Sequence, residues 1–133
     1  MEEKKLKQLY SRKKYSIKKH PPKKGSYWTF DDFKKWYSDQ YSKEPVCYYC
    51  GIPEKFIKRV YWDIRGTKRP ATRIRLELER LDPCGNYNSE NVVLACFNCN
   101  NCKSDIFTHN EFKVIGKTIE KFWKEIVEEN NIK

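Results

Sequence analysis

The chain has 133 residues, the size of a single domain with one modest core. Only 38% of the residues are hydrophobic while 35% are charged, so the core is expected to be thin and to need a stabilising cross-link. No stretch approaches membrane-spanning length and no signal-type segment begins the chain, so we expect an intracellular protein without a membrane partner. In that setting its six cysteines are more often metal ligands or free thiols than disulfides.

Basic residues gather in two segments and bring the net charge to +10. Residues 1–24 hold ten Lys or Arg against two Glu, and residues 54–75 hold eight basic against two acidic residues. Such clusters suit a phosphate backbone, because each neutralised phosphate releases a bound counterion. Solvated surface or a solubility tail is the alternative, but two separate clusters and 15% aromatic content favour nucleic acid. The candidate contacts are Lys13, Lys14, Lys18, Lys19, Arg69 and Arg73.

Helical spacing of apolar residues over residues 4–19 predicts a basic helix or arm, which "HPPKKG" then breaks. We treat residues 1–26 as this N-terminal arm and 27–133 as the folded domain. Thr29, with Asp32 three residues on, predicts the start of a short helix. The buried stripe of that helix is expected to consist of Phe30, Phe33, Tyr37 and Tyr41, as core and not as a base-stacking platform.

A Cys-x-x-Cys turn, "VCYYCGI", follows this helix. In "RIRLELERL" (residues 73–81), apolar and charged residues alternate, which predicts a half-buried strand with a charged outer face. "DPCGNYNSEN" is rich in turn residues, "VVLAC" is a second short strand, and residues 98–105 suit a short helix. Thr108 with Glu111 caps a last helix. Its apolar face is Phe112, Ile115, Ile119, Phe122 and Ile126. The fold class is therefore α+β.

The cysteines of two Cys-x-x-Cys pairs are the strongest chemical signal. They are Cys47, Cys50, Cys96 and Cys99. Zinc prefers four thiolates at tetrahedral geometry, and each such turn presents two of them. We therefore predict a structural zinc site in preference to a redox pair or free thiols. Cys84 and Cys102 are left over and need no special role.

Four thiolates leave no open position on zinc, so any chemistry needs a second site. Glu79, Asn91 and Asn100 are the nearby hard oxygen ligands, of the kind that suits Mg²⁺ with waters and a substrate phosphate. Each also has an ordinary interpretation, with Glu79 as a charge on a strand face, Asn91 as a turn residue and Asn100 as a polar group at the start of a helix. Spacing alone leaves the choice open.

The segment "LERLDPCGNYNSENVVLACFNCNNCKSD" resembles the HNH nuclease motif, a ββα-metal fold in which a zinc knuckle braces a hairpin and a helix. The similarity extends over about residues 27–123. The stretches "FKKWY", "CYYCGI", "GNYNSEN", "LACFNCN" and "KSDIF" resemble in particular a rare-cutting restriction endonuclease of that family. The resemblance implies a zinc-stapled HNH core with flanking helices and a basic N-terminal arm.

The resemblance also implies roles for individual residues. Glu79 takes the acidic metal-ligand position, Asn100 the second ligand position, and Asn91 the central Asn that fixes the loop. Lys103 takes the position of a frequent basic residue, which we add to the DNA contacts. The catalytic ion would be Mg²⁺ or Mn²⁺, beside structural Zn²⁺.

One departure concerns the general base, which is usually a His at the position of Arg80. Arginine stays protonated and cannot take a proton from water near neutral pH, so Arg80 would hold the phosphate instead. The rare-cutting relative also has an Arg there, and a tyrosine is thought to begin cleavage. Tyr49 is the first candidate for that role here and Tyr48 the second. A packing or phosphate-contacting tyrosine is the alternative for both.

The resemblance thus implies a metal-dependent, restriction-type endonuclease that hydrolyses phosphodiester bonds in double-stranded DNA. By analogy, a homodimer would cut a palindrome, since two-fold symmetric sites match two-fold proteins. The products would carry 5′-phosphate and 3′-hydroxyl ends. The rival functions are a catalytically decayed zinc-stapled DNA-binding module and a monomeric nicking enzyme of phage or homing type.

Overall fold

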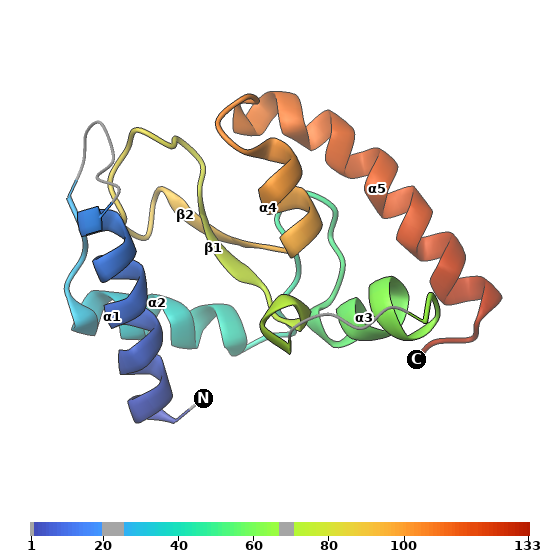
Figure 1. The fold of residues 1–133 in the computed structure, drawn as a ribbon, viewed down its shortest axis with the longest axis horizontal. Helices are drawn as coiled ribbons and strands as arrows, with labels where there is room; N and C mark the ends of the chain where they lie inside the picture. Colours follow the sequence, from blue (N-terminus) through green and yellow to red (C-terminus); the bar gives the residue numbers. More distant parts are fainter. Residues whose placement is uncertain (1, 20–25, 67–70) are drawn as a thin grey trace. The chain divides into compact units, whose positions relative to one another are not determined.

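The computed structural model describes residues 2–19, 26–66 and 71–133 (Figure 1). Arg69 lies outside the described residues, as do the side chains of Lys18 and Lys19. The chain divides into two compact units, residues 1–43 with 80–92 and residues 44–79 with 93–133. No helix in the described parts of the chain is long and apolar enough to cross a membrane.

In the first unit the basic segment forms helix α1, Glu3–Lys19, as its spacing predicted. Leu6 is buried, and the Tyr10 hydroxyl donates a hydrogen bond to the Trp28 carbonyl at 2.7 Å. The Tyr27 hydroxyl in turn donates to the Tyr10 carbonyl at 3.0 Å. These contacts anchor the middle of α1 in its unit, so its lysines are carried on a fixed helix.

Helix α2, Phe30–Tyr41, begins as predicted, because Thr29 Oγ1 accepts a hydrogen bond from the Asp32 amide at 3.2 Å. The predicted stripe is only partly right. Phe33 and Tyr37 are buried, whereas Phe30 and Tyr41 are half-buried. Trp36, which the prediction missed, completes the buried face because it is three residues from Phe33.

The second unit contains most of the remaining helical structure. Helix α3, Glu54–Lys58, continues into a π-helical turn, Arg59–Asp63, and a 3₁₀ turn covers Ala71–Ile74. Helix α4 runs over Phe97–Lys103 and helix α5 over His109–Glu129. Both hydrogen bonds of the predicted capping box, between Thr108 and Glu111, are present at the start of α5.

The predicted apolar face of α5 is only partly right, since Phe112 is buried whereas Ile115, Ile119 and Ile126 are half-buried. Phe122 is 42% exposed and lies under the guanidinium of Arg65. The buried residues are Phe112, Gly116 and Trp123, whose separations of four and seven residues follow the helical period and put them on one face. Phe122 is one residue out of that register.

Strands β1, Glu77–Arg80, and β2, Val92–Ala95, pair antiparallel. β1 is shorter than predicted, because the chain up to Ile74 is in the 3₁₀ turn. The expectation that Glu79 lies on a charged outer face is also wrong. Its side chain is only 9% exposed, and the reason lies in the site described next.

Candidate functional site

The first half of the metal site is the turn from Cys47 to Cys50. The Cys47 amide donates to the Ile52 carbonyl at 3.0 Å, and the Gly51 amide donates to the Cys47 carbonyl at 2.9 Å. Gly51 closes the turn with φ of +73°, a left-handed conformation that favours glycine. Local backbone geometry thus presents the two sulfur atoms together.

The second half comes from the end of β2 and the first turn of α4. All four predicted cysteines are buried, and their Sγ atoms lie within 4.8 Å of one another. Cys50 Sγ and Cys96 Sγ are 3.8 Å apart. Four sulfurs around one zinc at about 2.3 Å would be separated by about 3.8 Å, so the donor set and its spacing fit Zn²⁺. Hydrogen bonds from the other three thiols, Cys50 first, lower the pKa of Cys47 and favour its thiolate.

Helix α5 braces this cysteine turn at two points. The Trp123 indole donates from Nε1 to the Cys50 carbonyl at 2.8 Å. Gly116 passes so close to the turn that a Cβ there would lie 2.4 Å from the Tyr49 carbonyl oxygen. The turn also bonds to β2, since the Tyr48 amide donates to the Leu94 carbonyl at 2.8 Å. The cluster therefore joins the turn, β2, α4 and α5 into one rigid base.

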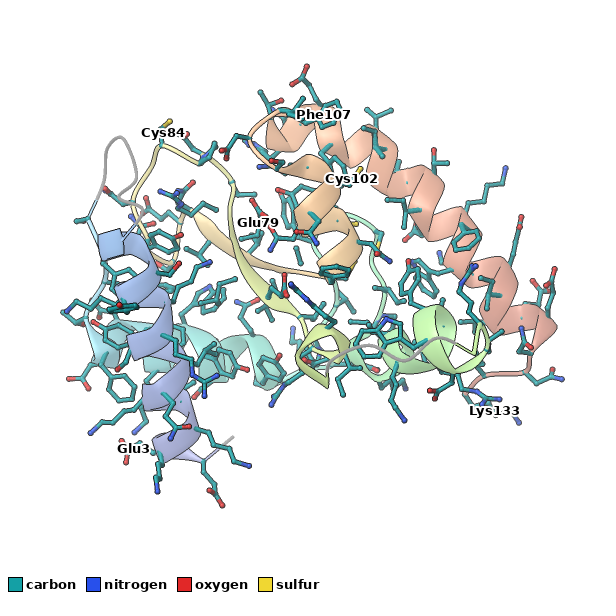
Figure 2. All side chains as sticks on the ribbon, viewed as in Figure 1. Glu3, Glu79, Cys84, Cys102, Phe107 and Lys133 are labelled. Atoms are coloured by element: carbon teal, nitrogen blue, oxygen red, sulfur yellow. The ribbon has the colours of Figure 1, made fainter. Side chains whose placement is uncertain are left out.

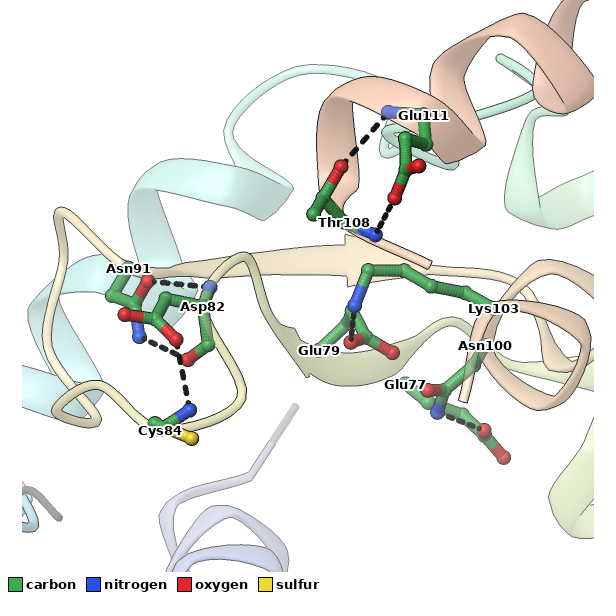
Figure 3. Close-up of polar contacts among 9 residues, drawn as sticks. All are labelled: Glu77, Glu79, Asp82, Cys84, Asn91, Asn100, Lys103, Thr108 and Glu111. Atoms are coloured by element: carbon green, nitrogen blue, oxygen red, sulfur yellow. Dashed lines mark hydrogen bonds and ion pairs between the residues drawn. The ribbon is translucent and has the colours of Figure 1, made fainter. Parts of the chain in front are cut away.

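On that base, β1 presents two carboxylates to α4 (Figure 3). Glu79 Oε1 lies 3.3 Å from Lys103 Nζ, and Asn100 Nδ2 donates to Glu77 Oε1 at 2.9 Å. Residues two apart on a strand share a face, as do residues three apart on a helix. The two predicted ligands, Glu79 and Asn100, therefore belong to facing surfaces, and both can offer hard oxygen atoms to a divalent ion.

Lys103 is fully buried, at 0% exposure. The prediction that Lys103 contacts DNA is therefore wrong, because an ammonium enclosed beside Glu79 does not reach a phosphate in solvent. Its burial also explains that of Glu79, since a carboxylate enters a protein interior when it is paired. The sequence shows both residues but not their pairing, which is a tertiary contact across 24 positions.

Arg73, another predicted DNA contact, is held within the same unit. Its Nη1 donates to Glu77 Oε2 at 3.0 Å, and its guanidinium lies over the Phe97 ring at 4.3 Å. Sequence reasoning did not single out Glu77. The signal for it was available, because Glu77 and Glu79 are two apart on a strand and must share a face.

Tyr49, the first candidate for the base, is buried, and its hydroxyl has no hydrogen-bond partner among the described residues. Burial, and secondly the charge of Glu79, raises the pKa of Tyr49 well above its ordinary value. This environment favours the neutral phenol. Tyr48, the second candidate, is 36% exposed, with Lys113 Nζ over its ring at 4.6 Å.

In the first unit, Asn91 braces the loop before β2. Its Oδ1 accepts from the Asp82 amide at 2.9 Å, and its Nδ2 donates to the carbonyls of Asp82 and Asn86 at 3.0 and 2.8 Å. Gly85 leaves room for this side chain, since a Cβ there would lie 2.7 Å from Asn91 Nδ2. These contacts hold the loop before β2, and the role in the site that the resemblance implied for Asn91 stays a prediction.

Arg80 follows Glu79 in the chain and is held by the same loop. Its Nη1 donates to the Gly85 carbonyl at 3.0 Å, and its guanidinium lies over the Tyr87 ring at 4.5 Å. Lys13 of α1 approaches the same ring, with Nζ 5.9 Å from the centroid, while Lys14 lies over Tyr10. The first unit thus carries Arg80 and the lysines of α1 on one scaffold.

The two leftover cysteines are not members of the four-cysteine cluster. Cys84, in the loop before β2, and Cys102, on α4, are both exposed free thiols (Figure 2). Neither contributes to the four-cysteine site, as expected.

Comparison with solved structures decides the family. The solved structure of PacI, a rare-cutting HNH restriction endonuclease that exhibits a mechanism of DNA perturbation, matches this fold with a TM-score of 0.69. The match has 30% sequence identity and covers 91% of this chain and 80% of that chain. The chain belongs to the HNH endonuclease family. No protein-family model matches the sequence, and a search of the curated proteins finds no match.

Membership of the HNH family agrees with the architecture described above. The antiparallel pair β1–β2, the helix α4 and the four-cysteine cluster form the α+β core that the motif predicted, and the cluster is compatible with zinc binding. The arrangement as a whole supports a nuclease function.

Proposed function

We propose that this HNH protein is a metal-dependent, restriction-type endonuclease that hydrolyses phosphodiester bonds at specific sites in double-stranded DNA. The observation that carries the proposal is that the facing surfaces of β1 and α4 carry Glu79 and Asn100, in the unit that also holds the four-cysteine cluster. The likeness to PacI and the net charge of +10 support DNA as the substrate.

Two metals with different chemistry are part of the proposal. The four cysteines would hold Zn²⁺, whose coordination would be complete, so its role is to stabilise the fold. Glu79 and Asn100 would hold Mg²⁺ or Mn²⁺ through oxygen atoms. When bound there, the divalent ion would act as a Lewis acid toward the scissile phosphate and the departing 3′ oxygen.

By analogy with the HNH motif, further residues would orient the phosphate and offset its charge. Arg80 uses one Nη group on the Gly85 carbonyl and stacks on Tyr87, which leaves other N–H donors of a fixed guanidinium for phosphate oxygens. Asn91 would keep the loop that carries this arginine in shape. Lys103 would hold the Glu79 carboxylate in its ionised, oriented form.

Removal of a proton from the attacking water is assigned to a water network or to Tyr48. Tyr49 is less suited to that role, because its buried hydroxyl favours the neutral state. A tyrosine that stays neutral is a poor acceptor for the proton of the attacking water, so Tyr49 would act mainly in packing.

DNA affinity would come from basic residues, with Lys13 and Lys14 on α1 as the proposed contacts among the described residues. A homodimer acting on a palindrome, with 5′-phosphate and 3′-hydroxyl products, is proposed by analogy with a restriction enzyme.

The arginine at the position of the usual base histidine favours one rival, a decayed DNA-binding module.

The test uses supercoiled plasmid with zinc-loaded protein and added Mg²⁺, Mn²⁺ or Ca²⁺. We expect linear product with Mg²⁺ and Mn²⁺, and binding with little cutting in Ca²⁺. Nicked circles that never become linear would indicate a monomeric nicking enzyme. Tight binding without cleavage in any metal would indicate the decayed module and contradict the proposal.

A further inference from the structure

We propose that Glu77, clamped by Arg73, is a positioning residue that turns the Asn100 amide so that its oxygen faces the catalytic ion. This inference rests on the proposed function, in which Asn100 is a metal ligand. It assigns a task to two residues that neither the motif nor the comparison assigns.

The first observation is that the two oxygens of Glu77 have separate partners, of which Figure 3 shows Asn100. Oε1 accepts from Asn100 Nδ2 at 2.9 Å, and Oε2 accepts from Arg73 Nη1 at 3.0 Å. Arg73 is itself fixed by the Phe97 ring, 4.3 Å from its guanidinium carbon. A chain of contacts therefore runs from Phe97 through Arg73 and Glu77 to Asn100.

The second step is chemical. An ionised carboxylate can only accept hydrogen bonds, so it must face the amino group of an asparagine amide and never its carbonyl oxygen. Turning the Asn100 amide over would bring two oxygen atoms together and lose the hydrogen bond. Glu77 thus leaves Oδ1 as the group directed away from itself.

Only one end of an amide can bind a metal ion. The oxygen is a hard ligand suited to Mg²⁺, whereas the amino group presents hydrogens and repels a cation. In an asparagine without an orienting partner, the two ends differ little in shape and the amide can present either. A fixed acceptor such as Glu77 removes the unproductive orientation before the ion arrives.

Arg73 explains why Glu77 would orient the ligand and not bind the ion itself. Its guanidinium occupies Oε2 and offsets the negative charge, while Asn100 occupies Oε1. Glu79, two residues on, is instead paired with the ammonium of Lys103. Two carboxylates on one strand face would therefore have different tasks.

The experiment measures Mn²⁺ binding by electron paramagnetic resonance, with the zinc-loaded protein on a DNA duplex that carries a non-hydrolysable phosphate analogue. Glu77→Ala should weaken Mn²⁺ binding by about 10-fold to 100-fold, the usual cost of losing a partner that orients a metal ligand. DNA affinity and zinc content should not change. The matched control is Glu44→Ala, which removes a carboxylate from an exposed pair with Lys55 in the same unit.

A second background separates orientation from simple charge. Asn100→Asp replaces the amide with a carboxylate that has no wrong end, so Glu77→Ala should weaken Mn²⁺ binding much less there than in the wild-type background, or should strengthen it by relieving repulsion. Glu77→Ala removes one negative charge near the ion in both backgrounds, so this effect cancels when the two losses of Mn²⁺ affinity are compared. Equal weakening by Glu77→Ala in both backgrounds would overturn the inference.

The side-chain amide signal of Asn100 in a ¹⁵N correlation spectrum gives a readout without DNA, metal or cleavage. Its protons should shift in Glu77→Ala and less in Glu77→Gln, whose oxygen can still accept. An unmoved signal would overturn the inference. If the Glu77 effects on the amide and on Mn²⁺ appear but wild-type protein cuts no DNA, the proposed function fails and the inference stands.

Discussion

Replacing Lys103 with methionine would remove the cation of the buried pair that holds Glu79. The ammonium is fully enclosed and lies 3.3 Å from Glu79 Oε1, while Glu79 is only 9% exposed. Methionine fills a similar volume without charge, so the main effect is on Glu79, whose carboxylate loses the Lys103 ammonium while remaining buried.

The distance sets the scale of the effect. At 3.3 Å, with an effective dielectric constant of about 20, the attraction is about 5 kcal/mol. Breaking one side of a buried pair typically costs about 3 to 5 kcal/mol, which agrees. Against a total stability of roughly 5 to 15 kcal/mol, the melting temperature should fall on the order of 10 to 20 °C.

Urea unfolding of zinc-loaded protein would measure this loss. The double variant Glu79→Gln, Lys103→Met should recover most of it, because no buried charge remains. Added Mn²⁺ should stabilise Lys103→Met more than wild type, since the ion can compensate the carboxylate. The control is Lys124→Met, which breaks an exposed pair with Glu120. If Lys103→Met changes stability by no more than about 0.5 kcal/mol, as an ordinary surface change does, the buried pairing is refuted.

Four further predictions concern the cysteine turn and the tyrosines. Metal analysis should give about one zinc per chain, and Cys47→Ser should unfold or aggregate the protein because metal binding is folding energy; a soluble, cooperatively folded zinc-free form would contradict this. Gly116→Ala should destabilise by about 1 to 3 kcal/mol through its clash with the Tyr49 carbonyl, although alanine is the better helix former, and a gain in stability would disprove the close packing. Tyr49→Phe should keep its cleavage rate within a few-fold, whereas loss of a true base would cost about 10²-fold or more in single-turnover assays. Burial raises the pKa of Tyr27 and of Tyr49, so both tyrosines ionise at lower pH in the unfolded chain than in the folded one. The free energy of unfolding should therefore keep their contribution below about pH 10 and lose it as the pH rises further, which urea unfolding across alkaline pH would detect.

Local patterns predicted those features whose signal lies within a few residues. The two Cys-x-x-Cys pairs, the Thr29 cap and the Thr108–Glu111 capping box all depend on short spacings, and each is present. Helix faces were harder, because an apolar residue such as Phe122 can satisfy the pattern and still lie one position off the buried register.

Pairings between distant charged residues could not be predicted. Alternation along β1 assigns Glu79 to the polar face, and only the tertiary contact with Lys103 shows that this face is covered by α4. The link from Arg73 to Glu77 and on to Asn100 has the same origin. A sequence records which charges exist, but burial decides which of them act on each other.

The most direct test of the central claim is single-turnover cleavage of duplex DNA by Glu79→Gln at saturating protein and Mg²⁺. Glutamine keeps an acceptor for the buried Lys103, so this variant should lose less stability than Glu79→Ala while it removes the carboxylate charge. Zinc content and DNA affinity are measured on the same sample. We expect both to match the wild-type protein while cleavage is lost. Cleavage at the wild-type rate would show that Glu79 holds no catalytic ion and would contradict the proposed site.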